Sequence, residues 1–463
     1  MDQLYQAAPV PMQQWMVAIY GYGWYHRRFS THFHRLVSEY QAREAWSCAQ
    51  FSQYQERQLA EVFKAAWNSP YYRQVFQEAG IRSDMASFET LQRLPLLTKE
   101  NLRIRPQDLL TQPKLPRGVI VHKSSGTTGT STHIYYTREF HALELAVAEA
   151  RNLHWAGVHF KDRRVMFGVR KVCNYDQGMP PFWRYSPAEN MAYASIYHLS
   201  ADNLPHYMDF LRKYRPAIIM GYPSALSTIA AYALEHSDFP APANAIITMS
   251  ETLESRARQT IEAAWQTRIW DRYGAVEGCI FASQCEYGRY HVSPEIGLLE
   301  ILDRQGKPCL PGEMGEVVCT GLQNTLQPLI RYRIGDVARW SEDQFCPCGR
   351  HMPLIEGIEG RYEDICITPD GREILRFDTV FKGVDTIKES QIVQERVDLF
   401  IIYVVPGLNF GPADIDILKK NMRMHVGNVQ TKIEIVSNIP RSPSGKFRAV
   451  ISKLNQMRDS SVE

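Results

Sequence analysis

Apolar residues recur at helical spacing over the first 95 residues, and few turn signals interrupt them. The pattern predicts a helical region over residues 1–95. Because large apolar side chains mostly fill protein cores, we expect its aromatic residues to pack inside the molecule. For the aromatic start of the chain, contact with a membrane surface or with a partner is the alternative. The aromatic residues concerned are Trp15, Tyr20, Tyr22, Trp24 and Tyr25 at the start, and Trp67, Tyr71, Tyr72 and Phe76 in a later window.

Strand-like and helical runs alternate from Leu96 to about Ile358. The segment PAIIMGYPSALSTIAAYALEHS (216–237) begins as an apolar strand and continues as an amphipathic helix, and ANAIITMSETLESRARQTIEAAW (243–265) has the same pattern. Such alternation is typical of α/β layers. We therefore predict the α/β fold class, with layered, mostly parallel sheets in a large N-terminal domain of several subdomains over residues 1–359.

After Gly360 the pattern changes to a compact alternation of short strands and helices around a PDG turn, residues 369–371. This alternation predicts a small α+β domain over residues 360–463. The boundary between the two domains is expected at Gly360 to Asp364.

Composition is that of an enzyme without a membrane span. A chain of 463 residues exceeds what one hydrophobic core usually serves, so two or more domains are expected. The balance of 52 basic against 50 acidic side chains argues against a protein built to hold nucleic acid or anionic membrane. There is no apolar stretch near 20 residues, and the start of the chain lacks the basic region of a signal peptide. Nine irregularly spaced cysteines favour a reducing cytoplasm over a disulfide framework.

A loop rich in glycine and hydroxyl side chains, SSGTTGTST, covers Ser124 to Thr132. Loops of this composition surround phosphate oxygens with backbone N–H groups and short side chains, although a polar linker has the same composition. Strand-like runs flank the loop on both sides, so it lacks the strand–loop–helix setting of a Walker loop. The candidate phosphate-binding residues are Ser124, Ser125, Gly126, Thr127, Thr128 and Gly129.

Four further motifs follow this loop in order: YGAVEG (273–278), RYRIGD (331–336), GRYED (360–364) and PRSPSGKFR (440–448), which contains Lys446. Each is a weak signal alone, but five ordered motifs are very unlikely to arise by chance. From LPLLTKENLR (94–103) to Lys446 the chain resembles the adenylate-forming, or acyl/aryl-CoA synthetase, superfamily. Within it the resemblance is to the phenylacetate-CoA ligase-like branch and its capsular-polysaccharide relatives.

The resemblance implies an AMP-forming ligase that activates a small carboxylic acid with ATP and Mg²⁺, releases pyrophosphate, and passes the acyl group to CoA. An amide ligase of polysaccharide or secondary-metabolite tailoring, which gives the acyl group to an amine, is the alternative within the same fold. A non-catalytic nucleotide-binding scaffold is the alternative from another class. The resemblance also implies that the C-terminal domain is a mobile lid, and it leaves a homodimer open.

The resemblance assigns roles to residues of the motifs. Lys446 bridges the carboxylate and the α-phosphate during adenylation, where a positioned cation carries much of the catalysis. Glu277 holds magnesium, and the Asp336 carboxylate accepts hydrogen bonds from the ribose hydroxyls. The remaining assignments are Tyr273 and Gly274 beside the adenine, Arg361 at ribose and phosphate, Glu363 as the hinge, and an acyl pocket of Phe167, Gly168, Tyr222 and Ser250.

Two positions depart from the family pattern. Thr130 stands where the family commonly has lysine, so one contact to triphosphate is missing, and Val276 stands where a threonine hydroxyl usually meets the α-phosphate. Near the acyl pocket, Arg170 and Lys171 are candidates to meet a second anionic or hydroxylated group, or are surface charges.

Two Cys/His pairs suggest a structural zinc site. Cys285 and His291 are spaced C-x5-H, and Cys346 and Cys348 are spaced C-x-C. Together they provide a Cys₃His set that can close a tetrahedral site without an open position. The alternative is that these are simply buried free cysteines.

Overall fold

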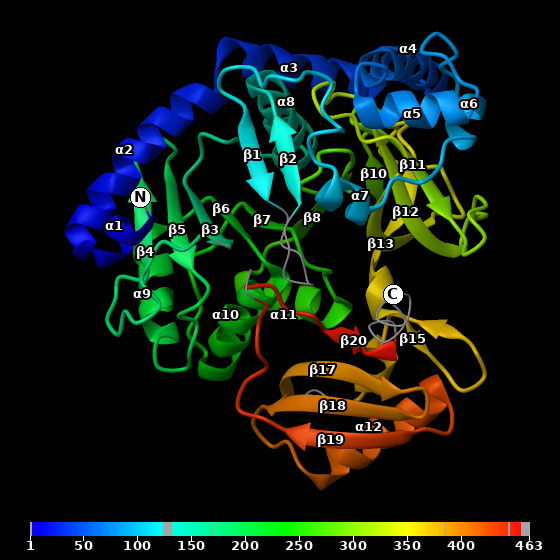
Figure 1. Cartoon of the computed structure of the whole chain (residues 1–463). Coiled ribbons are helices and arrows are strands. Elements are labelled where there is room, and N and C mark those ends of the chain that lie inside the picture. The colour runs from blue at the N-terminus through cyan, green and yellow to red at the C-terminus, as the bar shows by residue number, and fades with distance from the viewer. Residues whose placement is uncertain (1, 124–131, 169, 385, 443–444, 455–463) are drawn as a thin grey trace.

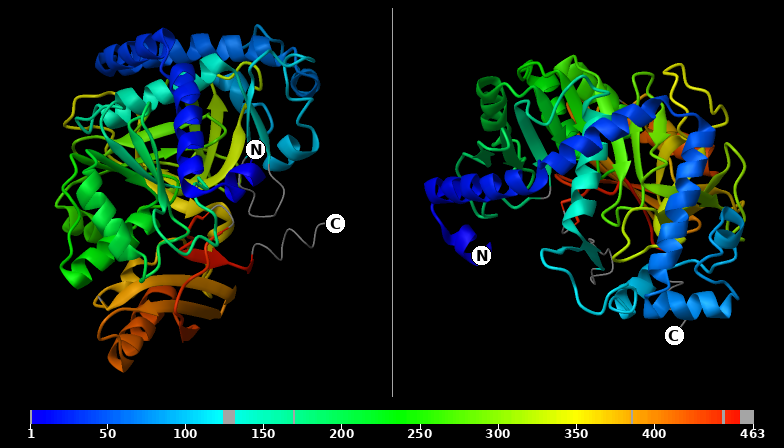
Figure 2. Two further views of the ribbon diagram at one scale, coloured as in Figure 1. Left: turned by 90° about the vertical axis from the view of Figure 1, so that its left-hand side faces the viewer. Right: turned by 90° about the horizontal axis from the view of Figure 1, so that it is seen from above.

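The computed structural model describes residues 2–123, 132–168, 170–384, 386–442 and 445–454. A large N-terminal part contains a twelve-stranded sheet with helices around it, and a smaller C-terminal part with its own four-stranded sheet lies below it in Figure 1. The N-terminal helices form an arc around the outside of the large part (Figure 2). Among the described residues, no helix is long and apolar enough to cross a membrane.

The predicted helical region is present, and side-chain caps define where its helices begin. The side chains of Ser30, Ser47, Ser69, Ser87 and Thr98 each accept a hydrogen bond from a backbone N–H of the first turn that follows. The helices are α1 (Asp2–Ala7), α2 (Val10–Arg28), α3 (Thr31–Ala42), α4 (Cys48–Ala66), α5 (Pro70–Glu78), α6 (Phe88–Gln92) and α7 (Lys99–Ile104).

The aromatic residues of this region divide between core and surface. As expected, Tyr72 and Phe76 are buried, and Trp67 and Tyr71 pack against the same cluster. The expectation of core packing was wrong for three residues of α2, which are exposed by 71% (Trp15), 62% (Tyr20) and 62% (Tyr22). The reason is that polar or small residues, including Gln13 and Gly21, occupy the inner face of α2 and turn these aromatics outward.

The large sheet has the strand order β11-β12-β13-β14-β10-β9-β8-β7-β6-β3-β5-β4. A separate hairpin, β1 (Ile120–Lys123) with β2 (His133–Tyr136), precedes it, followed by α8 (Arg138–Ala148) and a π-helical turn at Glu149–Leu153. The strands are β3 (Arg164–Gly168), β4 (Trp183–Ser186), β5 (Met191–Ser195), β6 (Ile218–Gly221), β7 (Ala245–Thr248), β8 (Ile269–Gly274), β9 (Phe281–Gln284), β10 (Tyr290–Val292), β11 (Gly297–Leu302), β12 (Met314–Gly321), β13 (Tyr332–Trp340) and β14 (Leu354–Arg361). Helices α9 (Leu204–Tyr214), α10 (Pro223–His236) and α11 (Ser255–Trp265) connect strands of the parallel half.

The α/β class and the separate C-terminal domain are confirmed, and the sheet is mixed. Strands β5, β3, β6, β7 and β8 pair in parallel, in the region where the strand–helix alternation was recognised. From β8 to β11 the pairing is antiparallel, so the expectation of mostly parallel strands holds for one half only. Antiparallel neighbours need no crossover helix, which is why the helical runs are missing from this half.

Helix α2 covers the free edge of β4. The Gln14 side chain donates to the Tyr185 carbonyl at 2.5 Å and accepts from the Tyr185 N–H at 3.0 Å, as a neighbouring strand would. Next to it, the buried Arg184 guanidinium donates to Gln13 Oε1. Polar side chains therefore hold α2 on the sheet edge.

A buried ion pair joins the π-helical turn to the segment before β11. Arg151 donates two hydrogen bonds to the Glu295 carboxylate, at 2.8 and 2.5 Å, and the two side chains are 1% and 0% exposed. The guanidinium also lies 5.4 Å from the centre of the Tyr40 ring on α3. Three elements distant in the sequence thus meet at one desolvated pair.

The C-terminal part packs helix α12 against a sheet of order β19-β18-β17-β20 around its own apolar core. Strand β14 still belongs to the large sheet, so the chain passes between the two parts after Arg361, within the predicted boundary segment. The elements after β14 are β15 (Cys366–Ile367), β16 (Glu373–Ile374), β17 (Ile387–Arg396), β18 (Leu399–Pro406), α12 (Pro412–Val426), β19 (Gln430–Ile435) and β20 (Val450–Ser452), with short 3₁₀ turns at Tyr362–Asp364 and Asp378–Phe381.

Candidate active site

A cleft of about 2090 Å³ lies between the large part and the C-terminal part. Residues of α10, α11, the end of β8 and β14 line it from one side, and β17 and the segment around Lys446 line it from the other. Three residues predicted to act on ATP, Glu277, Asp336 and Lys446, share this cleft although 169 positions separate the first from the last. Figure 1 shows the C-terminal segment crossing between the two parts at this level.

Asp336 is held between Tyr273 and Arg361. The Tyr273 hydroxyl donates to Asp336 Oδ2 at 2.6 Å, and Arg361 Nη1 donates to Oδ1 at 2.7 Å. The second contact follows from strand register, because Asp336 on β13 lies directly opposite Arg361 on β14. Since each carboxylate oxygen has two acceptor positions, both oxygens keep one for a further donor such as a ribose hydroxyl.

Glu277 is buried in the turn after β8, where its carboxylate accepts a hydrogen bond from the Tyr332 hydroxyl at 3.1 Å. Burial raises the pKa of this carboxyl. The next residue, Gly278, has a φ of +63°, and a Cβ there would lie 2.6 Å from both Phe140 and Glu144. The turn therefore needs glycine, because it is pressed against α8.

The segment around Lys446 is docked on the large part. The Phe447 N–H donates to Glu251 Oε1 at 2.6 Å, and the other oxygen of Glu251 accepts from the Ser224 N–H at 3.0 Å. Gly445 has a φ of +74°, and a Cβ there would lie 2.7 Å from Ile196 Cδ1. Burial, followed by the Arg361 charge, lowers the pKa of the Lys446 ammonium, while carboxylates including Asp336 raise it.

Some of the other predicted site residues line the cleft, and others do not. Tyr222 and Ser250 line the cleft, each just beyond the carboxyl end of a parallel strand, whereas Phe167 is fully buried and packs against Tyr207. Neither Phe167 nor Gly168 lines the cleft. Gly274 lines it beside Tyr273, and Glu363 lies in the 3₁₀ turn after β14. The predicted phosphate-binding residues Ser124, Ser125, Gly126, Thr127, Thr128 and Gly129, and the departure at Thr130, lie outside the described residues.

Several residues of the site were missed by sequence reasoning. Tyr332 lies inside the motif RYRIGD, and Glu251 follows the predicted pocket residue Ser250, but no pattern indicated that Tyr332 holds Glu277 or that Glu251 docks the lysine segment. Lys99 also lines the cleft, where burial lowers the pKa of its ammonium. Arg448 pairs with Asp364 beside the predicted hinge.

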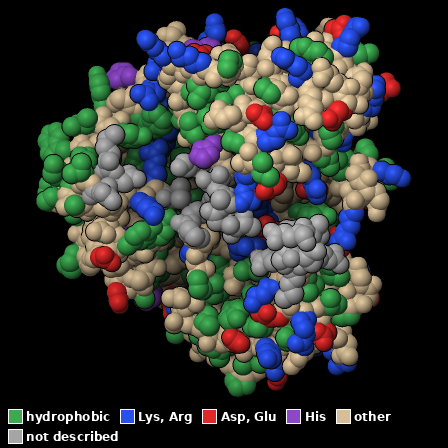
Figure 3. Space-filling model, viewed as in Figure 1, with side chains coloured by type: hydrophobic (Ala, Val, Ile, Leu, Met, Phe, Trp, Pro, Cys, Tyr) green, Lys and Arg blue, Asp and Glu red, His purple; other side chains and the backbone are tan. Residues whose placement is uncertain are grey.

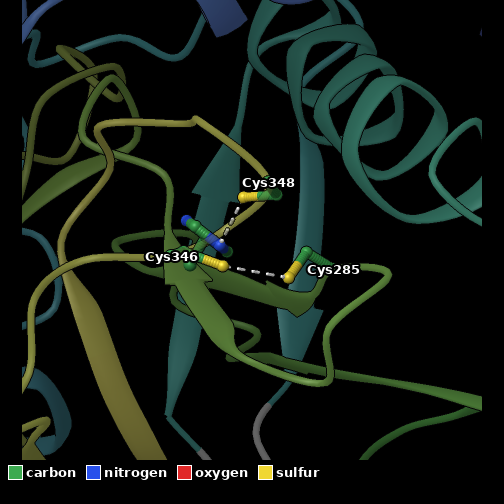
Figure 4. Close-up of side chains that lie close together, drawn as sticks. Cys285, Cys346 and Cys348 are labelled. Atoms are coloured by element: carbon green, nitrogen blue, oxygen red, sulfur yellow. Dashed lines mark hydrogen bonds between the residues drawn. The ribbon is translucent and has the colours of Figure 1, made fainter.

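The predicted metal ligands lie together, and none of the four lines the cleft. The thiols of Cys285, Cys346 and Cys348 point toward one another in Figure 4. The ligand atoms of these three cysteines and His291 all lie within 4.8 Å of one another, with Cys285 Sγ 3.6 Å from Cys346 Sγ and Cys348 Sγ 3.3 Å from His291 Nε2. Zinc–sulfur bonds of about 2.3 Å at tetrahedral angles place two sulfur atoms about 3.8 Å apart, so the spacing fits zinc.

Comparison with known proteins agrees with this architecture. The family described as the CapK C-terminal domain matches residues 366–453. The chain is 25% identical over 461 residues to protein CapK of Staphylococcus aureus, covering 98% of this chain and all of that protein. It is 28% identical to the phenylacetate-coenzyme A ligase of Escherichia coli, covering 68% of this chain and 71% of that protein.

Among solved structures, 2-hydroxyisobutyryl-CoA ligase shares the fold at 22% identity. Its postadenylation state, in complex with R3-HIB-AMP, superposes with a TM-score of 0.70 over 90% of this chain and 93% of that one. The TM-score falls to 0.56 for its thioesterification state. Together with the two relatives above, these structures bear out the resemblance to the adenylate-forming superfamily.

Proposed function

We propose that the protein is an AMP-forming ligase that activates a carboxylic acid with ATP and then transfers the acyl group to CoA. The observation that carries this proposal is the convergence of Lys446, Glu277 and Asp336 on one interdomain cleft. Kinship with phenylacetate-coenzyme A ligases supports it.

In the first half-reaction a carboxylate oxygen of the acid attacks the α-phosphorus of ATP, and the bond to pyrophosphate breaks. The Lys446 ammonium faces the negative charge that develops on the carboxylate and phosphate oxygens. The Asp336 carboxylate orients the ribose, with Tyr273 and Arg361 fixing its rotamer. Glu277 would hold Mg²⁺, which neutralises phosphate charge when bound, because hard divalent cations take carboxylate and phosphate oxygens together.

In the second half-reaction the thiolate of CoA attacks the acyl carbon, the bond to the phosphate oxygen breaks, and AMP leaves. We propose that the C-terminal domain, residues 360–463, rotates about Glu363 between the two steps, away from the large domain, residues 1–359. Rotation would break contacts between the two parts. They include the hydrogen bond from Phe447 to Glu251, the hydrogen bonds from Arg256 to the carbonyls of Val384 and Ile387, and the ion pair of Lys388 with Glu235.

The test is pyrophosphate exchange into ATP with a panel of aryl, fatty and amino acids, followed by measurement of AMP release with CoA or hydroxylamine as acceptor. We expect exchange that depends on one class of acid and turnover that depends on CoA. Turnover at full rate without CoA would favour the amide-forming alternative, which the departures at Thr130 and Val276 keep open. Absence of exchange with every acid would refute the proposal.

We also propose that Cys285, His291, Cys346 and Cys348 hold one structural zinc ion. Burial lowers the pKa of His291 to about 4, so its imidazole is neutral and able to coordinate a metal. The four residues come from the end of β9, from β10 and from the loop between β13 and β14. Bound zinc would therefore fasten the segment after Glu277 to the segment after Asp336.

We expect about one zinc per chain in protein purified without added metal, and none in Cys346→Ser. The variant should melt at a lower temperature while its preference among acids stays the same, because a structural metal contributes to folding directly. Elemental analysis and thermal unfolding measure both effects, with Cys48→Ser, an exposed cysteine on α4, as the matched control. A fully folded, metal-free wild-type protein would contradict the assignment.

The cytoplasmic location, the homodimer and the absence of nucleic-acid partners stay predictions from the sequence.

A further inference from the structure

Three buried nitrogen atoms without hydrogen-bond partners lie on side chains of α2 and β1. They are Trp24 Nε1, Arg28 Nε and His122 Nε2, and none has a partner among the described residues. The indole and guanidinium nitrogens are donors, and the imidazole nitrogen donates in one of its two neutral tautomers. Leaving a buried donor unpaired destabilises the fold. Three such atoms on neighbouring side chains therefore indicate that an acceptor binds there.

The three side chains form one contiguous cluster. The Arg28 guanidinium lies 4.2 Å from the centre of the Trp24 ring, and the Trp24 ring lies 5.5 Å from that of His141 on α8. The His141 and His122 rings are 6.0 Å apart. We call Trp24, Arg28, His122 and His141, together with Arg170, the α2 cluster.

The α2 cluster has an excess of positive charge. Arg28 lies 3.5 Å from Glu189, whose carboxylate also accepts from the Tyr193 hydroxyl, and a second cation, Arg170, lies 4.4 Å from the centre of the Tyr193 ring. Arg170 therefore adds a second positive charge beside the pair of Arg28 with Glu189. Burial and then the Arg170 charge lower the pKa of Arg28 to about 10, as expected for a cation short of counter-charge. Figure 3 shows basic side chains recessed between the hydrophobic surface of α1 and α2 and the middle of the molecule.

The cluster adjoins the proposed site of adenylation. The His122 ring lies 4.5 Å from the Tyr136 ring, and the Tyr136 hydroxyl donates to the carbonyl of Val276, the residue before Glu277. Arg170 stands two positions beyond the carboxyl end of β3, the strand with β5 on one side and β6 on the other. Parallel sheets bind their ligands at such a reversal of strand order.

We infer that the α2 cluster binds an anionic group, a second carboxylate or a phosphate, at the far end of the acid that the enzyme activates. This inference rests on the proposed function and narrows it to acids that carry two anionic groups. Arg28 and Arg170 supply the charge, and Trp24 and His122 supply neutral hydrogen-bonding groups.

The test is pyrophosphate exchange with acids matched in shape: hexanoate against adipate, and phenylacetate against 4-carboxyphenylacetate and 4-phosphonooxyphenylacetate. We expect kcat/KM to be at least about tenfold higher for the anionic member, which corresponds to one charge-assisted hydrogen bond. The last two acids distinguish a carboxylate from a phosphate as the preferred group.

Arg28→Met should lower kcat/KM for the anionic acid by about 10- to 100-fold and change the value for its neutral partner by less than about threefold. Arg28→Lys should restore part of the preference, because the charge remains. Arg57→Met is the control: it removes the same charge from an exposed position of α4, outside the α2 cluster, and should leave the preference unchanged. If Arg28→Met does not fold, as judged by circular dichroism, Arg170→Met tests the same cluster from another element.

A preference for neutral acids would overturn the inference, and so would an equal loss for both members of a pair. An effect of Arg57→Met as large as that of Arg28→Met would also overturn it, because the preference would then follow the net charge of the protein rather than a site built by the cluster. Absence of exchange with any acid at all would instead refute the proposed function, and the inference would fall with it.

Discussion

Lys446→Ala is expected to slow adenylate formation by about a hundred- to a thousand-fold while leaving transfer from a preformed adenylate near the wild-type rate. Removing one preorganised cation from a developing phosphoryl charge costs about 3–4 kcal/mol, which gives this factor. The split between the two steps is expected because Lys446 lies in the C-terminal part and lines the cleft on a segment whose Phe447 N–H donates to Glu251 of the large part. Rotation of the C-terminal domain would withdraw the lysine before the second step.

Pyrophosphate exchange measures the first step, and AMP release from a synthetic acyl-adenylate with CoA measures the second. Lys453→Ala is a suitable control, since Lys453 lies in the same domain and pairs with Glu395 at 2.6 Å. If both half-reactions of Lys446→Ala fell together in a folded protein, the two-orientation mechanism would be wrong.

Glu295→Ala is expected to lower the free energy of unfolding by about 3–5 kcal/mol, because it leaves the Arg151 guanidinium buried and unpaired. The pair is 1% and 0% exposed, so water cannot replace the lost carboxylate without opening the core. The change is measured by chemical denaturation of the whole protein, with intrinsic fluorescence as the readout.

The double variant Arg151→Met/Glu295→Met should be less destabilised than Glu295→Ala, since replacing both charges by apolar groups of similar volume is often neutral. An exposed pair, Arg82 with Asp84, provides the control: Asp84→Ala should leave the free energy of unfolding nearly unchanged, because solvent screens an exposed pair. Equal effects of Glu295→Ala and Asp84→Ala would show that the buried pair is dispensable.

Local motifs indicated candidate residues of the site but not the contacts between them. Lys446, Glu277 and Asp336 were assigned from ordered motifs, each a local pattern, and the fold brings them to one cleft. The partners of Asp336 depend on strand register across β13 and β14, and the partner of Phe447 lies 196 positions away. No local pattern encodes such pairings.

The fold could be predicted where the hydrophobic periodicity and the length of the connections both indicate the same strand–helix arrangement. Strand–helix alternation predicted the parallel half of the sheet, whereas the antiparallel half consists of strands whose partners only the tertiary structure selects. For α2, helical spacing predicted a helix but not which face is buried. The buried face is decided by Arg184, which needs Gln13 as a hydrogen-bond partner and so turns Trp15 to the solvent.

The contact between Gln14 and the edge of β4 prevents a strand of another molecule from pairing with this edge of the sheet. A strand added to an edge offers a new edge in turn, so pairing of that kind can propagate from molecule to molecule. A glutamine side chain satisfies one carbonyl and one N–H but presents no further row of donors and acceptors. Helix α2 therefore terminates the sheet at this edge, and the helix that carries Arg28 into the interior also limits edge-to-edge growth on the outside.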